Sequence, residues 1–354
     1  MNSPEAKIDV AAVVANWRML ASLAPEADAA AVVKADGYGL GAAPLARALA
    51  RAGCRRFYVA WPQEGVALRS ALGAGPEIAV LNGFAGARAQ DLHDHGLQPV
   101  LNSVQDVRKW LDLGSRRMPA ALHLDTGMNR LGLSQGDWGT AAEAMRDAAP
   151  ARVMSHLACA DEPDHPMNRR QLDLFQGGAA LWPGVARSFA STAGVYLGAD
   201  YAFEEVRCGI GLYGGGPAPP QGRSLSTVLT LSTPILQVRT IEPGEAVGYG
   251  ATFTAAAPTQ LATIGIGYAD GFLRAASNRG YAVVQGERRP ILGRVSMDLV
   301  VLDVTGLSVT QGDAVELAGS AMPIGEQAAA MSTIDYELLT RLGTRVRRIY
   351  TGEA

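Results

Sequence analysis

Eight short apolar runs, separated by Ala- and Leu-rich segments with helical periodicity, constrain the fold of this chain most strongly. The first run ends at Lys34, and the others cover residues 57–60, 78–81, 99–101, 121–124, 152–155, 187–190 and 205–207. Apolar strands that alternate with helices are typical of a parallel sheet covered by helices. Eight such units predict a (β/α)8 barrel, the TIM-type fold. A doubly wound sheet is the alternative, but the chain lacks the glycine fingerprint of a dinucleotide-binding fold.

Polar and glycine residues follow directly after these runs. They are Lys34, Asn82, Asn102, Asp125, His156, residues 191–194 and Arg207. The carboxyl ends of all strands in such a barrel meet at one face, and active sites lie on that face. The sequence therefore predicts an active site at the carboxyl-terminal face of the barrel.

A glycine- and proline-rich stretch over residues 214–222 marks a domain boundary, because it can continue neither a helix nor a central strand. Beyond it, turns separate segments rich in Val, Ile, Leu and Thr, at residues 227–241, 260–268, 281–284, 290–303 and 313–318. This pattern predicts a mostly β domain. We therefore expect a barrel domain over residues 1–221, opening with a helix capped by Asp9, and a β domain over residues 222–354.

The composition argues against several classes of partner. A net charge of −3 gives no reason to expect nucleic acid or an anionic membrane. No apolar run reaches membrane-spanning length, and the first residues have neither the basic nor the apolar region of a signal peptide. The three cysteines are widely spaced and match no zinc pattern, so we expect no metal, reduced thiols and a cytoplasmic location.

Lys34 ends its apolar run and is followed by three alternating glycines, at positions 37, 39 and 41. Burial disfavours the ammonium form and lowers the pKa of such a lysine, and a neutral amine can attack a carbonyl to form a Schiff base. The glycines allow backbone N–H groups to approach a phosphate at the start of the next helix. A solvated lysine in an ordinary βα turn is the alternative on these residues alone.

The segment Val-Val-Lys-Ala-Asp-Gly-Tyr-Gly at residues 32–39 resembles the pyridoxal-phosphate (PLP) lysine signature of alanine racemases. Further segments resemble the same family in order along nearly the whole chain, at residues 124–132, 154–158, 206–214, 248–252, 267–271 and 294–298. The resemblance implies a PLP-binding barrel with a β domain, and interconversion of L- and D-alanine for peptidoglycan of the cell wall.

The resemblance also implies two catalytic residues, because racemisation needs an acid or base on both faces of the substrate. Lys34, which holds PLP, matches one, and Tyr249 matches the other. Arg207 matches the residue that faces the pyridine nitrogen, where an arginine does not give up a proton. His156 matches its partner and lies between it and the tyrosine in the family pattern.

The remaining site residues follow from the same resemblance. The phosphate contacts match Tyr38, Thr192, Gly209, Ile210 and Tyr336, where Thr192 stands in place of the usual serine and keeps the hydroxyl. Arg130 matches the residue that binds the substrate carboxylate. Tyr268 and Met297 match residues that shape a small pocket.

The family pattern implies a homodimer with shared active sites, in which Tyr249, Tyr268 and Met297 complete the site of the other subunit. Two alternatives remain. A barrel-type PLP amino-acid decarboxylase would need a cysteine and an acidic motif in the β domain, and no cysteine follows Cys208. A non-catalytic PLP-carrier protein resembles the barrel alone.

His123 departs from the family pattern. Alanine racemases commonly carry a lysine at this position, and its carbamate supplies a negative charge beside the substrate-binding arginine. An imidazole holds no stable carbamate, so Arg130 requires another partner. A neutral His123 that accepts a hydrogen bond is one alternative. A bound anion such as chloride is the other, and it is favoured because a guanidinium near a buried site needs a counter-charge.

Overall fold

The computed structural model describes residues 3–114, 118–220 and 222–352. These residues form two compact units. The first unit comprises Val13–Leu212 and Gly216–Leu225, and the second comprises the residues before Val13, Tyr213–Gly215 and the residues from Ser226 onward. No helix in the described ranges combines the length and the apolar character that crossing a membrane requires.

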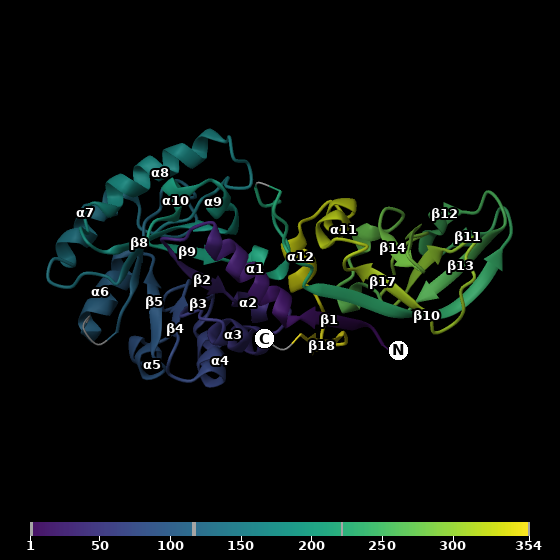
Figure 1. Cartoon of the computed structure of the whole chain (residues 1–354), viewed down its shortest axis with the longest axis horizontal. Helices are drawn as coiled ribbons and strands as arrows, with labels where there is room; N and C mark the ends of the chain where they lie inside the picture. The colour runs from purple at the N-terminus through teal and green to yellow at the C-terminus, as the bar shows by residue number, and fades with distance from the viewer. Residues whose placement is uncertain (1–2, 115–117, 221, 353–354) are drawn as a thin grey trace. The chain divides into compact units, whose positions relative to one another are not determined.

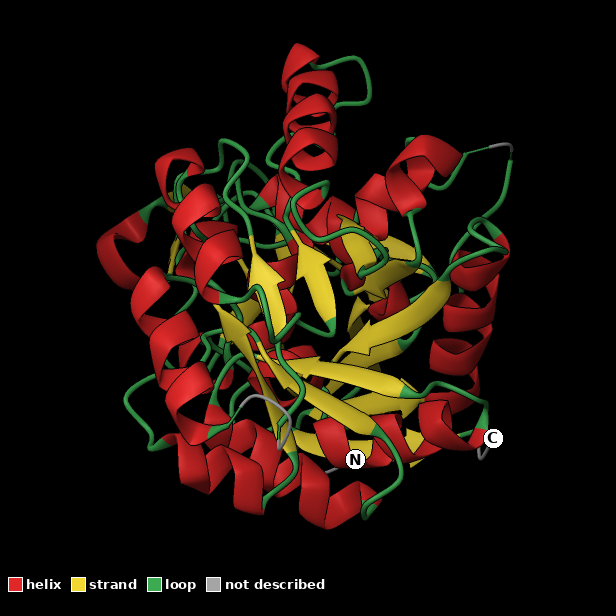
Figure 2. Ribbon diagram, turned by 90° about the vertical axis from the view of Figure 1, so that its left-hand side faces the viewer, coloured by secondary structure: helices red, strands yellow, loops and turns green. Residues whose placement is uncertain are grey.

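The first unit is a closed barrel of eight parallel strands (Figures 1 and 2). In order around the barrel they are β2 (Asp28–Val32), β3 (Arg56–Val59), β4 (Glu77–Val80), β5 (Leu97–Leu101), β6 (Ala121–His123), β7 (Arg152–Met154), β8 (Ala186–Ser191) and β9 (Glu205–Cys208). Parallel pairing of β9 with β2 closes the ring, with Ala30 opposite Arg207. The predicted (β/α)8 barrel is therefore confirmed, and the doubly wound sheet is excluded.

Helices surround this ring, as the end-on view in Figure 2 shows. They are α1 (Val10–Ser22), α2 (Lys34–Tyr38), α3 (Ala42–Arg51), α4 (Pro62–Leu72), α5 (Ala89–Asp94), α6 (Val104–Leu113), α7 (Gln135–Ala144), α8 (Pro166–Ala179), α9 (Thr192–Tyr196) and α10 (Ala199–Ala202). The helix α1 begins where expected, because Asp9 Oδ1 accepts a hydrogen bond of 2.9 Å from Ala12 N. Amphipathic helices bury one face on the strands, as Leu45 and Leu49 of α3 do.

Ion pairs occupy the amino-terminal end of the barrel. Glu205, at the start of β9, lies 3.1 Å from Arg152 Nε and also pairs with Arg56. Tyr58 donates a hydrogen bond of 2.5 Å to the same carboxylate, and Arg56 lies 2.9 Å from Glu77. Because these ion-paired side chains occupy this end of the barrel, the opposite end is left for a ligand.

The second unit is built on an eight-stranded sheet. Its strands are β1 (Glu5–Asp9), β10 (Leu229–Ile241), β13 (Thr259–Ile264), β14 (Tyr281–Val284), β15 (Glu287–Pro290), β16 (Val300–Asp303), β17 (Ala314–Ala318) and β18 (Arg347–Thr351). A small two-stranded sheet of β11 (Ala246–Val247) and β12 (Phe253–Thr254) and the helices α11 (Ile324–Ala330) and α12 (Asp335–Thr340) complete it. The mostly β second domain is therefore observed.

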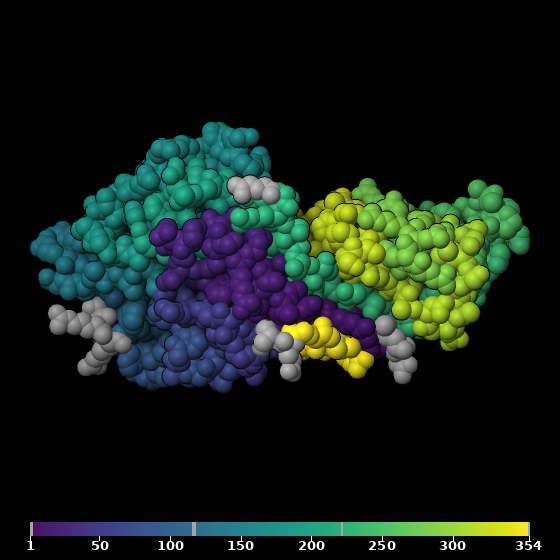
Figure 3. Space-filling model, viewed as in Figure 1, coloured from purple at the N-terminus to yellow at the C-terminus, as the bar shows by residue number. Residues whose placement is uncertain are grey.

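The first strand differs from the expectation that residues 1–221 form the barrel domain. β1 pairs antiparallel with β10 and parallel with β18, so it is part of the sheet of the second unit. Figure 3 shows the purple start of the chain beside the yellow C-terminal strand. Both partner strands lie more than 200 residues away in the sequence, and five residues of β1 carry no local signal of that pairing.

Candidate active site

The polar residues predicted at the carboxyl ends of the strands lie there in the structure. Lys34 follows β2, His123 ends β6, His156 follows β7 and Arg207 lies in β9. Burial lowers the pKa of His156 well below its ordinary value, and the charges of Arg207, Arg130 and Lys34 lower it further. Cationic groups from three different strand ends therefore act on one imidazole, which stays neutral at pH 7 and makes this end of the barrel suited to an anionic ligand.

Lys34 opens a left-handed turn. Ala35, Asp36, Gly37 and Tyr38 all have positive φ, at 52°, 52°, 64° and 55°. A non-glycine residue in this region costs roughly 1–2 kcal/mol. Two carboxylates hold the turn, since Glu64 Oε1 accepts from Ala35 N at 2.7 Å and Asp36 Oδ1 accepts from Ala42 N at 2.8 Å. The glycines predicted a phosphate-binding turn, but the residue types gave no signal for its handedness.

The Lys34 side chain is half-buried. Burial lowers its pKa first and the positive charge of Arg130 lowers it further, while Glu64 acts in the opposite direction. Because the neutral amine is the nucleophilic form, this environment suits a lysine that attacks a carbonyl, as the sequence predicts.

The Arg207 guanidinium is buried and held by three oxygen acceptors. Nη1 donates to Ser188 Oγ at 2.6 Å, and Nη2 donates to the carbonyls of Ser155 at 2.5 Å and Phe189 at 3.3 Å. Within the described residues, Nε has no hydrogen-bond acceptor, so its N–H remains for a ligand. Nη2 also lies 3.4 Å from His156 Nδ1, and because a guanidinium only donates, the proton of the neutral imidazole is on Nε2.

Thr192, Tyr38 and the turn after β9 form a set of neutral donors. Thr192 Oγ1 accepts hydrogen bonds from Gly209 N at 3.0 Å and from Gly211 N at 3.3 Å. A hydroxyl has two acceptor sites and one donor, so its own proton is left for a third group. A Cβ at Gly209 would lie 2.7 Å from Tyr38 Oη, so a side chain there would push the phenol away. The 3-10 helix Ile210–Tyr213 begins at this turn.

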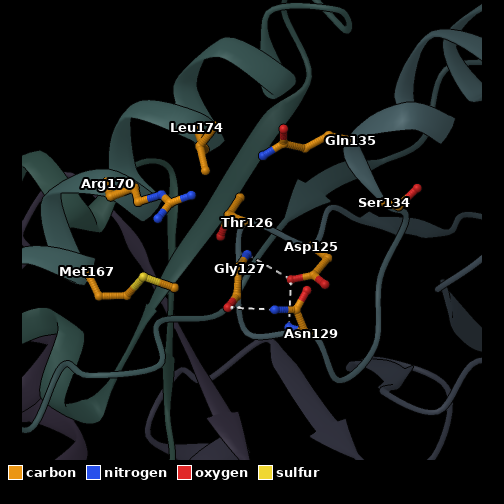
Figure 4. A pocket seen from close by; sticks show the side chains of 9 residues that line it. All are labelled: Asp125, Thr126, Gly127, Asn129, Ser134, Gln135, Met167, Arg170 and Leu174. Carbon is orange, nitrogen blue, oxygen red and sulfur yellow. Dashed lines mark hydrogen bonds between the residues drawn. The ribbon is translucent and has the colours of Figure 1, made fainter.

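Arg130 lies on the loop between β6 and α7. Asp125 Oδ1 shapes this loop by accepting from Gly127 N at 2.9 Å and Asn129 N at 3.1 Å (Figure 4). A cavity of about 310 Å³ lies beside the loop, and it is lined by Asp125, Thr126, Gly127, Asn129, Ser134, Gln135, Met167, Arg170 and Leu174. The Arg130 side chain is exposed, and no ion pair or hydrogen bond to it occurs in the described ranges.

Four of the predicted site residues lie in the second unit. Tyr249, in the 3-10 helix Tyr249–Ala251, is 73% exposed, Met297 is 53% exposed, and Tyr268, in the 3-10 helix Tyr268–Asp270, is 45% exposed. Tyr336 lies in α12 and is half-buried. The first three are large apolar side chains at the surface, which leaves them available to a second molecule.

Ser188 was not among the predicted site residues. Its hydroxyl accepts a hydrogen bond from Arg207 and donates one of 3.1 Å to the Glu205 carbonyl, which orients Arg207. Ser188 lies inside an apolar strand. Nothing in the sequence distinguishes a serine that binds a buried charge from an ordinary serine in such a strand.

Two family models match this chain. The model described as "Alanine racemase, N-terminal domain" matches residues 8–217, and that of the C-terminal domain matches residues 228–350. The chain belongs to the alanine racemase family. An alanine racemase of Rhodospirillum rubrum is 43% identical over 98% of this chain and 95% of its own length. One of Agrobacterium fabrum, named catabolic, is 44% identical over 97% of this chain and 91% of its length.

A solved structure supports the same assignment. The alanine racemase of Bartonella henselae, a crystal structure with covalently bound pyridoxal phosphate, has a TM-score of 0.94 at 38% identity. The match covers 99% of this chain and 100% of that chain. The barrel and the mostly β domain of this alanine racemase family member are therefore those of its relatives.

Proposed function

We propose that this chain is a PLP-dependent amino-acid racemase that interconverts L-alanine and D-alanine. The observation that carries the proposal is the match of both alanine racemase domains along the chain, combined with a barrel face on which Lys34, Arg207 and Thr192 come together. The assignment makes the protein an isomerase, with PLP as cofactor and alanine as substrate.

The residues present fit PLP. The Thr192 hydroxyl, whose two acceptor sites are filled by Gly209 N and Gly211 N, has its proton left for a phosphate oxygen. The Tyr38 hydroxyl, which lies against Gly209, and the amide of Ile210 provide further neutral donors. Lys34 would hold the aldehyde carbon, and the free Nε donor of Arg207 would face the ring nitrogen. Tyr336, the fifth residue proposed for the phosphate, lies in the second unit.

PLP, when bound, supplies an electron sink that stabilises negative charge on the substrate α-carbon. The protein's own residues must then hold and move the proton. We assign the Lys34 amine to one face of the α-carbon and the Tyr249 phenol to the other, because inversion requires an acid and a base on opposite faces. The lowered pKa of Lys34 keeps a fraction of the amine ready to accept that proton.

Arg207 and His156 set the electrostatics on the ring side. An arginine does not transfer its proton, so Arg207 would offer the ring nitrogen a permanent donor rather than an acid. The neutral His156 carries its proton on Nε2, as the contact with Arg207 requires, and we propose that this N–H donates to the Tyr249 oxygen.

Arg130, Tyr268 and Met297 complete the proposed substrate site. The Arg130 guanidinium binds the substrate carboxylate with forked N–H donors. Tyr268 and Met297 limit the pocket to a small side chain such as the methyl group of alanine. Because Tyr249, Tyr268 and Met297 are exposed in the single chain, we propose a homodimer in which each subunit supplies these residues to the site of the other.

We propose that the enzyme acts in the cytoplasm and supplies D-alanine for peptidoglycan. Deletion of the gene should make growth depend on added D-alanine. A deletion strain that grows without D-alanine, but fails to grow on alanine as nitrogen source, would favour the catabolic role in the name of the Agrobacterium fabrum relative.

A direct assay tests the activity. The purified protein with PLP should convert L-alanine to D-alanine and the reverse, and borohydride should fix the cofactor to Lys34. Release of carbon dioxide from an amino acid would indicate a decarboxylase, and bound PLP without turnover of either enantiomer would indicate a carrier protein. Either result would contradict the proposal.

Lys34→Ala should lose both the borohydride-fixed cofactor and the activity, whereas Lys109→Ala, on the exposed face of α6, should keep both.

A further inference from the structure

Asn102 and His123 form a hydrogen-bonded pair at the end of the barrel that carries the candidate active site. Asn102 follows β5, and His123 is the last residue of the neighbouring strand β6. His123 Nδ1 lies 2.8 Å from Asn102 Oδ1. A carboxamide oxygen only accepts hydrogen bonds, so Nδ1 of the imidazole carries a proton.

Backbone carbonyls fix the orientation of the Asn102 side chain. Asn102 Nδ2 donates to Leu81 O at 3.0 Å and to Val100 O at 3.1 Å. Both partners are acceptors, so the NH2 group must face them and Oδ1 must face His123. Burial, followed by the charge of Arg207, lowers the pKa of His123 to about 4, so the ring is neutral at pH 7. Its Nε2 is therefore an unprotonated acceptor.

The opposite edge of the imidazole faces the loop that carries Arg130. Leu133 N donates to His123 O at 2.8 Å, which brings the end of this loop back to β6. A Cβ at Gly132 would lie 3.2 Å from His123 Cδ2, the carbon bonded to Nε2. The acceptor is thus on the edge turned toward the loop, two residues from Arg130, and the charge of Arg130 acts on the ring. Within the described part of the chain, no hydrogen bond reaches His123 Nε2.

We propose that Asn102 and His123 are positioning residues for Arg130. His123 Nε2 accepts one N–H of the Arg130 guanidinium and aims the remaining donors at the substrate carboxylate, while Asn102 holds the ring in the tautomer that this contact needs. The inference rests on the proposed function, which makes Arg130 the carboxylate-binding residue. It favours a neutral acceptor over the bound anion that the sequence favoured, so activity needs neither halide nor bicarbonate.

Kinetics of four variants test the pair. His123→Leu and Asn102→Leu should raise KM for L-alanine at least about tenfold and change kcat less than about threefold, because the Arg130 guanidinium loses its acceptor or its alignment. His123→Gln should keep KM within about threefold, since an amide oxygen replaces the acceptor. The matched control is Gln98→Leu, which removes a side chain that donates a hydrogen bond of 3.0 Å to Glu77 and lies near the start of β5, the strand that Asn102 follows. An unchanged KM in His123→Leu, or equal damage in the leucine and glutamine variants, would overturn the proposal.

The tautomer provides a readout that does not depend on turnover. The chain has five histidines, so 15N-histidine NMR of the holoenzyme resolves a small set of rings, and His123→Gln identifies the His123 signals. Wild-type His123 should show a protonated Nδ1 and an unprotonated Nε2, and Asn102→Leu should shift it toward the Nε2-protonated form. A protonated Nε2 in the wild type would refute this inference even if alanine is racemised. The expected tautomer in a protein that does not racemise alanine would instead refute the proposed function.

Anion exchange completes the test. Replacement of chloride by gluconate at constant ionic strength, and removal of bicarbonate, should each leave KM and kcat unchanged. A loss of activity that chloride or bicarbonate restores would show that an anion accompanies Arg130, and the proposal would be wrong.

Discussion

At the scale of single residues, the site depends on small polar groups that hold charged ones. Ser188 is fully buried and gives Arg207 Nη1 its only acceptor within the described residues, at 2.6 Å. Ser188→Ala leaves a buried charged donor unpaired, which should lower the free energy of unfolding by about 1–3 kcal/mol. Urea denaturation measures this loss. Ser70→Ala, in the exposed face of α4, is the control and should change stability by less than about 0.5 kcal/mol.

His123 also predicts how stability depends on pH. Its folded pKa of about 4 lies below the ordinary histidine value of 6.5, so the unfolded chain binds more protons between these values. The free energy of unfolding should therefore fall as pH drops from 6.5 to 4, by up to about 3 kcal/mol from this residue. His156 acts in the same direction. Unfolding of the apoprotein across this range should be less pH-dependent in His123→Gln than in the wild type. An equal slope in wild type and His123→Gln would contradict the lowered pKa.

At the scale of elements, the left-handed turn after β2 is where the chain stores strain next to Lys34. Ala35 has φ 52°, a conformation that glycine adopts without steric cost. Ala35→Gly should therefore raise the free energy of unfolding by up to about 1 kcal/mol, whereas Ala67→Gly in the exposed face of α4 should lower it by about 1 kcal/mol. If the strained turn aligns the amine, the glycine variant should also lose kcat. A destabilised Ala35→Gly would show that this turn is not strained.

Elements differ in how far their sequence determines them. The barrel strands were predictable because each is a continuous apolar run between helical segments, as in β3 and β4. The turn at Lys34 was not, because Ala35 and Asp36 take a backbone conformation that their types disfavour and that Glu64, far along the chain, helps to hold. The contact between Asn102 and His123 depends on the pairing of two strands, so the sequence indicated both residues but not their hydrogen bond.

At the scale of the whole molecule, the pattern of the chain predicted two domains and the type of each. It could not assign β1 to the second unit, because β10 and β18 are distant in sequence. Tyr249, Tyr268 and Met297 were identified only through resemblance to a family, since exposed side chains in turns carry no periodic signal. Their proposed roles require a second subunit, and that requirement gives the most direct test.

Mixing two inactive variants tests the central claim, that Lys34 of one subunit and Tyr249 of another serve one racemase site. Lys34→Ala and Tyr249→Phe, each inactive or strongly impaired alone, should regain activity after subunits are exchanged by partial unfolding and dilution. Half of randomly formed dimers are mixed and each has one intact site, so about a quarter of wild-type alanine racemisation should return. No recovery, with mixed dimers demonstrated by mass spectrometry, would contradict the shared site.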